Sequence, residues 1–215
     1  MPTHYVHRGL IKRDLVENTL KAFRNSIKKG YGIETDLQIT KDKQIVCFHD
    51  FNLKRKFKLN KQIKKMNYDF LNKLSKKPED KIPLLKDLLK ISKNKYPLLL
   101  EIKPIFNKGS LKILLKLLKK TKKYRIFSFR EKNLINLYKL DKKLTLGLLF
   151  LSTSNLRIIK SKSKKPYVKF LGIEKSFLSN RKIDLIKKPI YYYTIKKKNL
   201  FNRYKDRKNL IFENL

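Results

Sequence analysis

Residues 3–39, THYVHRGLIKRDLVENTLKAFRNSIKKGYGIETDLQI, contain one complete strand–helix–strand unit. Residues 3–7 resemble a short strand, and residues 31–39 alternate in the manner of a second strand. Between them, residues 17–30 carry apolar side chains at helical spacing and end in a glycine. A helix that connects two strands allows them to lie parallel, because parallel strands need a long crossover connection. The unit therefore predicts a parallel sheet assembled from repeated strand–helix pairs.

The rest of the chain repeats this alternation. After the second strand, TKDK (40–43) predicts a tight turn and QIVCFHD (44–50) predicts an antiparallel return, so that a hairpin forms. Residues 51–81 are basic and irregular, with one helix expected near 68–74. Without the hairpin return, eight strands are expected, at residues 3–7, 32–36, 97–103, 124–128, 144–149, 168–173, 189–194 and 209–213. Eight strands separated by helices predict a compact (β/α)8 TIM-type barrel, a single domain over residues 1–215, with a small hairpin insertion after the second strand.

The chain is strongly basic. It has 56 Lys and Arg against 17 Asp and Glu, for a net charge of +39. Such a charge fits nucleic-acid or anionic-membrane binding, but the lysines are spread evenly and form no arm or tail. We therefore expect a solvated basic surface with no specific nucleic-acid partner, and weak contact with an anionic membrane stays open. The single cysteine, Cys47, allows no intrachain disulfide, and no signal core or spanning segment stands out, so a cytoplasmic location is expected.

Scarce acidic and histidine side chains gather near the expected ends of the first strands. In a barrel of this type, chemistry takes place at the mouth formed by the carboxyl ends of the strands. His7 and Arg8 end the first strand, and His49 ends the hairpin, which could fold back over the mouth. Two strands carry polar pairs that point to one face: Glu34 with Asp36, and Glu101 with Lys103.

These residue types suit cleavage of a phosphodiester. Three carboxylates that face one point repel one another unless a cation joins them, and oxygen ligands without cysteine suit Mg²⁺ or Ca²⁺. Arg8 and Lys103 offer positive charge for a phosphate. Two histidines on opposite sides of that phosphate, His7 and His49, could act as general base and general acid.

The ordered set of short motifs resembles the glycerophosphodiester phosphodiesterase family. The matching stretches are HRG (7–9), ENT (17–19), GIETD (32–36), TKD (40–42), HD (49–50) and EIK (101–103), with weaker matches at IPLL (82–85), FSF (127–129) and YTI (193–195). The resemblance is strong over residues 4–50, clear to about residue 130, and loose but collinear beyond.

The resemblance implies roles for ten residues. It assigns Glu34, Asp36 and Glu101 to a divalent metal, Mg²⁺ or Ca²⁺. It makes His7 and His49 the acid–base pair, and it places the remaining residues at the substrate phosphate (Arg8, Lys103, Tyr193) or in support of the site (Glu17, Asn18). Glu17 could pair with Arg8. It further implies hydrolysis of a small glycerophosphodiester to an alcohol and sn-glycerol 3-phosphate, with water or the substrate's own hydroxyl as the nucleophile.

The chain departs from the family pattern at three places. Tyr193 stands where the family usually has a tryptophan on the glycerol side of the substrate. Lys43 replaces a glycine after the TKD turn, and the C-terminal T-D-x-P element is absent, because the chain ends in NLIFENL (209–215).

Two alternatives remain open at this point. One is a lysophospholipase-D-like enzyme that acts on lipid substrates at a membrane. The other is a basic barrel that binds nucleic acid or membranes and has lost activity, although retention of all seven polar site residues argues against loss. The head group, the choice of metal and the oligomeric state stay undetermined.

Overall fold

A computed structural model describes residues 2–11 and 16–215 of the chain. It contains a closed ring of eight parallel strands, because β1 pairs with β2 on one side and with β9 on the other. The parallel strands are β1 (Tyr5–His7), β2 (Gly32–Ile39), β4 (Leu98–Ile102), β5 (Tyr124–Ser128), β6 (Leu146–Phe150), β7 (Phe170–Glu174), β8 (Ile190–Ile195) and β9 (Asn209–Phe212). The expected TIM-type barrel and its eight strands are confirmed.

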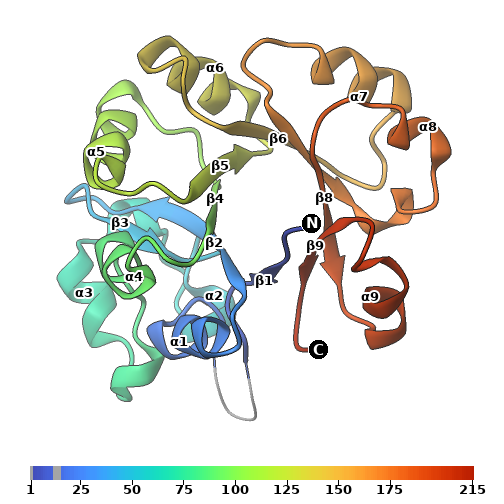
Figure 1. The fold of residues 1–215 in the computed structure, drawn as a ribbon. Coiled ribbons are helices and arrows are strands. Elements are labelled where there is room, and N and C mark those ends of the chain that lie inside the picture. Colours follow the sequence, from blue (N-terminus) through green and yellow to red (C-terminus); the bar gives the residue numbers. More distant parts are fainter. Residues whose placement is uncertain (1, 12–15) are drawn as a thin grey trace.

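The helices surround this ring (Figure 1). They are α1 (Leu20–Lys28), α2 (Lys54–Phe57), α3 (Tyr68–Lys73), α4 (Leu85–Ser92), α5 (Lys108–Leu118), α6 (Glu131–Leu140), α7 (Leu156–Ser163), α8 (Arg181–Asp184) and α9 (Lys198–Tyr204), with three short 3₁₀ turns, η1 (Ile63–Lys65), η2 (Pro78–Asp80) and η3 (Lys175–Phe177). Thr19 caps α1, since its side chain accepts a hydrogen bond from the Ala22 N–H, which would otherwise lack a partner. No helix in the described part of the chain is long and apolar enough to cross a membrane.

Two apolar layers hold the barrel together. The larger one lies between the strands and the surrounding helices. The smaller one fills the barrel interior and consists of Tyr5, Leu99, Phe127, Leu149, Phe170, Tyr191 and Ile211. The interior of such a barrel is a packed core and not a pore, so polar chemistry is confined to its mouth.

Replacing Gly147 by Ala is expected to destabilise the barrel, because the interior leaves no room for the added methyl group. A Cβ at Gly147 would lie 2.3 Å from the ring of Phe170. Overpacking of this kind costs about 1–3 kcal/mol in the free energy of unfolding. Gly109→Ala is the control, since its nearest contact would be at an ordinary 3.5 Å. Thermal unfolding measures both, and an unchanged Tm for Gly147→Ala would contradict this packing.

The insertion after β2 builds a core of its own. β3 (Ile45–Cys47) returns antiparallel to β2, which confirms the predicted hairpin. The helix expected near residues 68–74 is present as α3. The remainder of residues 51–81 was expected to be irregular, but it supplies α2, η1 and η2 and contributes to a small apolar cluster of Val46, Phe48, Leu53, Ile63, Leu71, Ile82 and Leu84. This cluster holds the segment that carries His49 against the β2 side of the ring.

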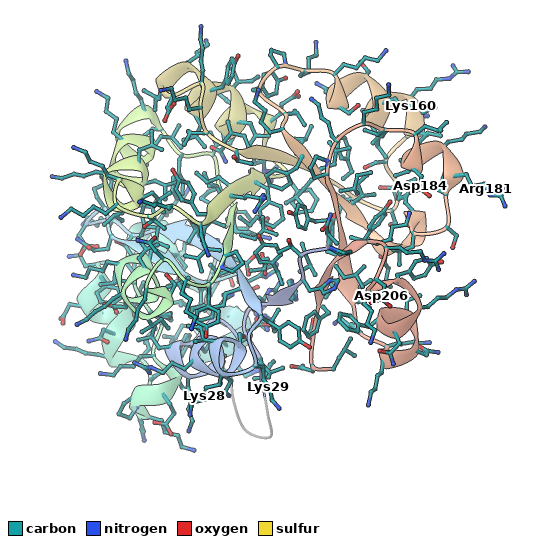
Figure 2. All side chains as sticks on the ribbon, in the orientation of Figure 1. Lys28, Lys29, Lys160, Arg181, Asp184 and Asp206 are labelled. Carbon is teal, nitrogen blue, oxygen red and sulfur yellow. The ribbon has the colours of Figure 1, made fainter. Side chains whose placement is uncertain are left out.

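The basic side chains are distributed around the molecule. Figure 2 shows nitrogen-tipped side chains that project from the outer helices around the outline, among them Lys28 and Lys29 at the end of α1, Lys160 on α7 and Arg181 on α8. This distribution agrees with the even spread of lysines along the sequence.

Candidate functional site

The sheet register brings the predicted polar residues together at the barrel mouth. His7 on β1 is paired in register with Glu34 on β2, and Asp36 on β2 is paired with Glu101 on β4. Glu34 and Asp36 are two residues apart on β2, so their side chains share one face of the strand. Their partners in register, His7 and Glu101, lie on the same inward face. Three neighbouring strands thus position one cluster.

The cluster is a buried group of three carboxylates. Glu34, Asp36 and Glu101 each contribute an oxygen that lies within 4.8 Å of the other two, and their exposed fractions are 2%, 0% and 7%. Burial and the neighbouring Asp36 raise the pKa of Glu101 to about 7, and burial with both other carboxylates raises the pKa of Glu34 well above its ordinary value. Burial also acts to raise the pKa of Asp36, but Arg8 and Lys103 outweigh it and hold that pKa at about 2.

Two basic side chains lie against these carboxylates. Arg8 Nε is 3.0 Å from Asp36 Oδ2, and Lys103 Nζ is 2.9 Å from Glu101 Oε1 and 3.5 Å from Asp36 Oδ1. Burial opposes the charged form of both bases, yet the carboxylates raise the pKa of each, so both cations are retained. The site therefore presents fixed positive charge next to a group of oxygen ligands.

The carboxylate cluster fits a divalent cation. Asp36 Oδ1 and Glu101 Oε1 are buried, and although Lys103 Nζ forms an ion pair with each, neither oxygen accepts a well-aligned hydrogen bond from the described part of the chain. A cavity of about 20 Å³, enough for one water-sized sphere, lies between Glu34, Glu101, His7 and Tyr193. Carboxylate oxygens are the ligands that Mg²⁺ and Ca²⁺ prefer, and a divalent charge would remove the repulsion that raises the pKa values of Glu34 and Glu101.

Each site histidine is held by a carboxylate at its Nδ1 atom. His7 Nδ1 lies 3.1 Å from Glu213 Oε2, and His49 Nδ1 lies 2.7 Å from Asp50 Oδ1. The hydrogen bond with His7 is the main cause that holds the pKa of Glu213 at about 2. For Asp50, burial acts to raise the pKa, but hydrogen bonds from Arg55 and His49 lower it. An ionised carboxylate can only accept, so Nδ1–H donates in both pairs and leaves Nε2 of each imidazole free for chemistry.

The two histidines face the cluster from different elements. His7 Nε2 is 4.0 Å from Glu34 Oε2 at the end of β1. His49 lies in the segment after β3 and lines, with Lys103, a cavity of about 710 Å³. Burial lowers the pKa of His49, which favours its neutral form. Both imidazoles thus border the site, His7 from β1 and His49 from the segment after β3, while a phosphate between them and their acid–base roles stay predictions.

The two expected supporting residues connect the parts of the site. Glu17 pairs with Arg8, as expected, with Oε2 3.0 Å from Nη1, and its other oxygen pairs with Arg55. Arg55 Nε in turn donates to Asp50 Oδ2 at 2.6 Å. A continuous chain of ion pairs therefore runs from Asp36 to His49.

Asn18 has a more direct part than expected. Its side chain donates to Asp36 Oδ2 at 2.9 Å and accepts from the Thr35 hydroxyl at 2.7 Å, so it orients one of the three carboxylates.

Tyr193 lies at the mouth near the cluster. Its hydroxyl donates to the Phe150 backbone oxygen at 2.7 Å, and its ring packs edge-on against Phe129. The ring lines the small cavity that Glu34 and Glu101 also line. Its predicted contact with substrate stays a prediction.

Three residues of the site were missed as site residues. Asp50 was noted only beside His49, although an acid next to a histidine is a usable signal. Glu213 ends the last predicted strand (209–213) and directly follows β9, so the strand-end rule that selected His7 applies equally to it. Arg55 lies in the run KRKFK (54–58) and nothing in the sequence distinguishes it from its basic neighbours.

Comparison with known proteins identifies a family over nearly the whole chain. The model of the glycerophosphoryl diester phosphodiesterase family matches residues 7–210. Human lysophospholipase D GDPD1 is 36% identical over 114 residues, which are 46% of this chain and 36% of the relative. A glycerophosphodiester phosphodiesterase of Bacillus altitudinis is 36% identical over 70 residues, 32% of this chain and 28% of the relative. The matched segments thus cover well under half of the length of these curated relatives.

Solved structures agree on the fold. A phosphodiesterase of Oleispira antarctica, in complex with the product sn-glycerol-3-phosphate, superimposes with a TM-score of 0.85 over 99% of this chain and 93% of its own, at 21% identity. A glycerophosphodiester phosphodiesterase of Thermotoga maritima gives a TM-score of 0.81 over 99% and 94% of the two chains, at 22% identity.

Proposed function

The chain belongs to the glycerophosphoryl diester phosphodiesterase family, and from that membership we propose that it hydrolyses a glycerophosphodiester to an alcohol and sn-glycerol 3-phosphate. One observation supports this most directly. Two imidazoles, each fixed at Nδ1 by a carboxylate, border a buried group of three carboxylates with two cations beside it.

In this proposal Glu34, Asp36 and Glu101 hold a divalent cation, Mg²⁺ or Ca²⁺. Such an ion, when bound, supplies Lewis-acid charge to a phosphoryl oxygen. Asn18 keeps Asp36 oriented through its 2.9 Å hydrogen bond. The raised pKa values of Glu34 and Glu101 favour protonation of these two side chains in the absence of an ion.

His7 and His49 carry the protons in the proposed reaction. One imidazole, neutral at Nε2, removes a proton from the attacking hydroxyl, which belongs to water or to the substrate, as its oxygen bonds to phosphorus. The other imidazole, protonated at Nε2, gives its proton to the departing alcohol oxygen as the bond from that oxygen to phosphorus breaks. Where the attacking hydroxyl is the substrate's own, this step leaves a cyclic phosphate, and water opens it in a second step, with the two imidazoles in exchanged roles, to give sn-glycerol 3-phosphate. Glu213 and Asp50 stabilise whichever imidazolium is present.

Arg8 and Lys103 neutralise the phosphate in this proposal. Both lie beside the carboxylates and stay charged. Charges that are already in place at a site sheltered from water stabilise developing negative charge without reorganisation. The Tyr193 hydroxyl donates to the Phe150 backbone oxygen, so in this proposal the ring of Tyr193 packs against the carbon framework of the substrate.

A direct assay tests the proposal. Purified protein is incubated with glycerophosphocholine and Mg²⁺ or Ca²⁺, and sn-glycerol 3-phosphate and choline are measured with and without a chelator. We expect both products to form with metal and to disappear with the chelator. Salt-sensitive DNA binding without turnover of any glycerophosphodiester would instead favour an inactive basic barrel.

Removing the Glu213 carboxylate, which lies 3.1 Å from His7 Nδ1, is expected to slow the reaction. Hydrogen bonds to charged groups contribute about 1.5–3 kcal/mol, so Glu213→Ala should lower kcat roughly 10- to 100-fold. Glu213→Gln keeps a hydrogen-bonding side chain, but its amide no longer imposes one tautomer on His7. Imidazole nitrogen NMR should then show loss of the Nδ1–H tautomer in both variants, whereas a merely structural role would leave the tautomer unchanged. Glu79→Ala, which removes a partly exposed acid in η2, is the control.

A further inference from the structure

Arg55 joins two carboxylates that serve different parts of the proposed site. Its Nε donates to Asp50 Oδ2 at 2.6 Å, and its Nη2 pairs with Glu17 Oε1. The other oxygen of Asp50 accepts from His49 Nδ1 at 2.7 Å, and the other oxygen of Glu17 accepts from Arg8 Nη1 at 3.0 Å. Both oxygens of each carboxylate are therefore used, one toward Arg55 and one toward the site.

This bridge needs two donor nitrogens in a fixed geometry. A guanidinium presents its N–H donors in a rigid planar fork, whereas a lysine has one ammonium on a flexible stem. Arg8 forms a bridge of the same kind, because its Nε lies 3.0 Å from Asp36 Oδ2 while its Nη1 contacts Glu17. Lysine is much the more frequent base in this chain, yet both bridging residues are arginines. Two successive arginine bridges thus connect the carboxylate cluster to His49.

The helix that carries Arg55 is anchored on both sides of this residue. Leu53 is fully buried in the small apolar cluster, and the ring of Phe57 packs against that cluster. Between them, Lys56 donates to the Asp80 backbone oxygen at 3.3 Å and lies over the Phe57 ring, 5.3 Å from its centre. Arg55 therefore reaches the two carboxylates from a fixed part of the fold.

Stability alone does not account for the bridge. The side chain of Arg55 is 57% exposed, and those of Glu17 and Asp50 are 22% and 18% exposed. Ion pairs with one partner this exposed contribute little to the free energy of unfolding, because water screens them and long side chains lose rotamer freedom. Catalytic geometry is more sensitive, since a displacement of about 1 Å can cost roughly 10²-fold in rate. The same ion pairs can therefore matter far more for turnover than for folding.

We propose that Arg55 is a positioning residue for the acid–base reaction. It fixes Asp50, which holds the His49 imidazole, and it also fixes Glu17, which holds Arg8. His49 comes from the segment after β3, and Arg8 directly follows β1, so Arg55 sets the position of the one relative to the other. This inference rests on the proposed hydrolysis, in which His49 moves a proton and Arg8 neutralises the phosphate.

Turnover of Arg55→Ala tests the inference. We expect kcat for glycerophosphocholine at saturating metal to fall about 10- to 100-fold, while KM stays within about threefold of the wild-type value. The Tm should change little. Arg181→Ala is the matched control, because Arg181 is exposed on α8, on a different side of the ring from α2 (Figure 1). A wild-type kcat in Arg55→Ala would overturn the inference, and a large rise in KM alone would show that Arg55 contacts the substrate instead.

The conservative variant separates charge from geometry. Arg55→Lys keeps the positive charge, but its single ammonium cannot reproduce two donors directed at two carboxylates. It should therefore recover only part of the kcat that Arg55→Ala loses. Full wild-type kcat in Arg55→Lys would show that charge alone is enough, which would overturn the bridge as the basis of positioning.

The exposure of Arg55 also allows a rescue experiment. In Arg55→Ala the space between the two carboxylates opens to solvent, so added guanidinium ion, far below denaturing concentration, should enter it and restore part of kcat. Sodium ion at the same ionic strength is the control for salt, and Arg181→Ala should not respond to either. A merely structural role would give no such rescue. If Arg55→Ala responds no more to guanidinium than to sodium, the positioning role is contradicted.

The tautomer of His49 separates this inference from the function on which it rests. The chain has three histidines, so single substitutions assign their imidazole nitrogen NMR signals. Neutral His49 should be the Nδ1–H tautomer in the wild type and a mixture of both tautomers in Arg55→Ala, while His7 keeps its tautomer. Unchanged His49 signals overturn the inference, whatever the turnover. No turnover of any glycerophosphodiester by the wild type, with the tautomer change present, overturns the phosphodiesterase proposal and leaves Arg55 as the residue that orients His49.

Discussion

Replacing Asp36 by Asn is expected to abolish turnover, with a loss in kcat of at least about 10³-fold. Asp36 is fully buried, belongs to the carboxylate cluster, and lies 3.0 Å from Arg8 and 3.5 Å from Lys103. Charge stabilisation by a bound metal is worth several kcal/mol, and about 1.4 kcal/mol corresponds to a tenfold change in rate. Steady-state turnover of glycerophosphocholine at saturating metal measures the effect.

The same variant should lose its response to metal. Addition of Mg²⁺ or Ca²⁺ is expected to raise the Tm of the wild-type protein, since a ligand that binds only the folded state stabilises it. Asp36→Asn should show no such increase. The control is Asp69→Asn, which alters an exposed acid on α3 that pairs with Lys73. A variant that keeps both turnover and the metal-induced rise in Tm would show that Asp36 is not a ligand.

Glu34→Gln is a second variant of the carboxylate cluster, and it tests the metal site in case Asp36→Asn does not fold. Removing one partner of a buried ion pair can cost about 3–5 kcal/mol, and Asp36 has two cationic partners. Burial and the neighbouring acids already raise the pKa of Glu34, so a neutral side chain resembles its protonated form. We therefore expect Glu34→Gln to fold with near wild-type stability and still to lose its metal response.

Replacing either site histidine by Ala should lower kcat by about 10²–10⁴-fold, which is the usual contribution of a general acid or base. The side chains of His7 and His49 are 16% and 32% exposed, and neither belongs to the carboxylate cluster. The metal-induced rise in Tm should therefore survive in both variants. His4→Ala is the control, because His4 packs against Phe201 and is not part of the site.

The two histidine substitutions are expected to be non-additive. When two groups act in one proton-transfer mechanism, removing the first already causes most of the loss in kcat that removing both would cause. The double variant should thus be about as slow as the slower single variant. If both single variants retain near wild-type kcat while Asp36→Asn is inactive, His7 and His49 are not the acid–base pair.

Local spacing was enough to predict most of the barrel and the carboxylate cluster. The strand–helix alternation identified all eight parallel strands, with boundaries that agree within a few residues. Glu34 with Asp36, and Glu101 with Lys103, are pairs two residues apart, and this spacing alone places both members on one face of a strand. The carboxyl ends of the strands form the mouth of such a barrel, and this rule identified His7 and Arg8 as site candidates because they end the first strand.

The insertion shows where local patterns are insufficient. Residues 51–81 have no sustained periodicity, so only the helix near 68–74 was predicted. Their order depends on packing with residues distant in sequence, since Leu53, Ile63 and Leu71 share the small apolar cluster with Val46 and Leu84. Arg55 joins Asp50 and Glu17 for the same reason, since only folding brings residues 38 positions apart into one ion-pair chain.

The sequence by itself determined the parallel barrel and seven of the ten candidate site residues, because period, spacing and strand ends are properties of short segments, while the resemblance to the family added Glu17, Asn18 and Tyr193. The tertiary structure decided which groups hold the two imidazoles. Glu213 lies 206 residues from His7, and the two meet only because β1 pairs with β9 when the barrel closes. Such contacts follow from register and ring closure, which depend on packing of the whole chain.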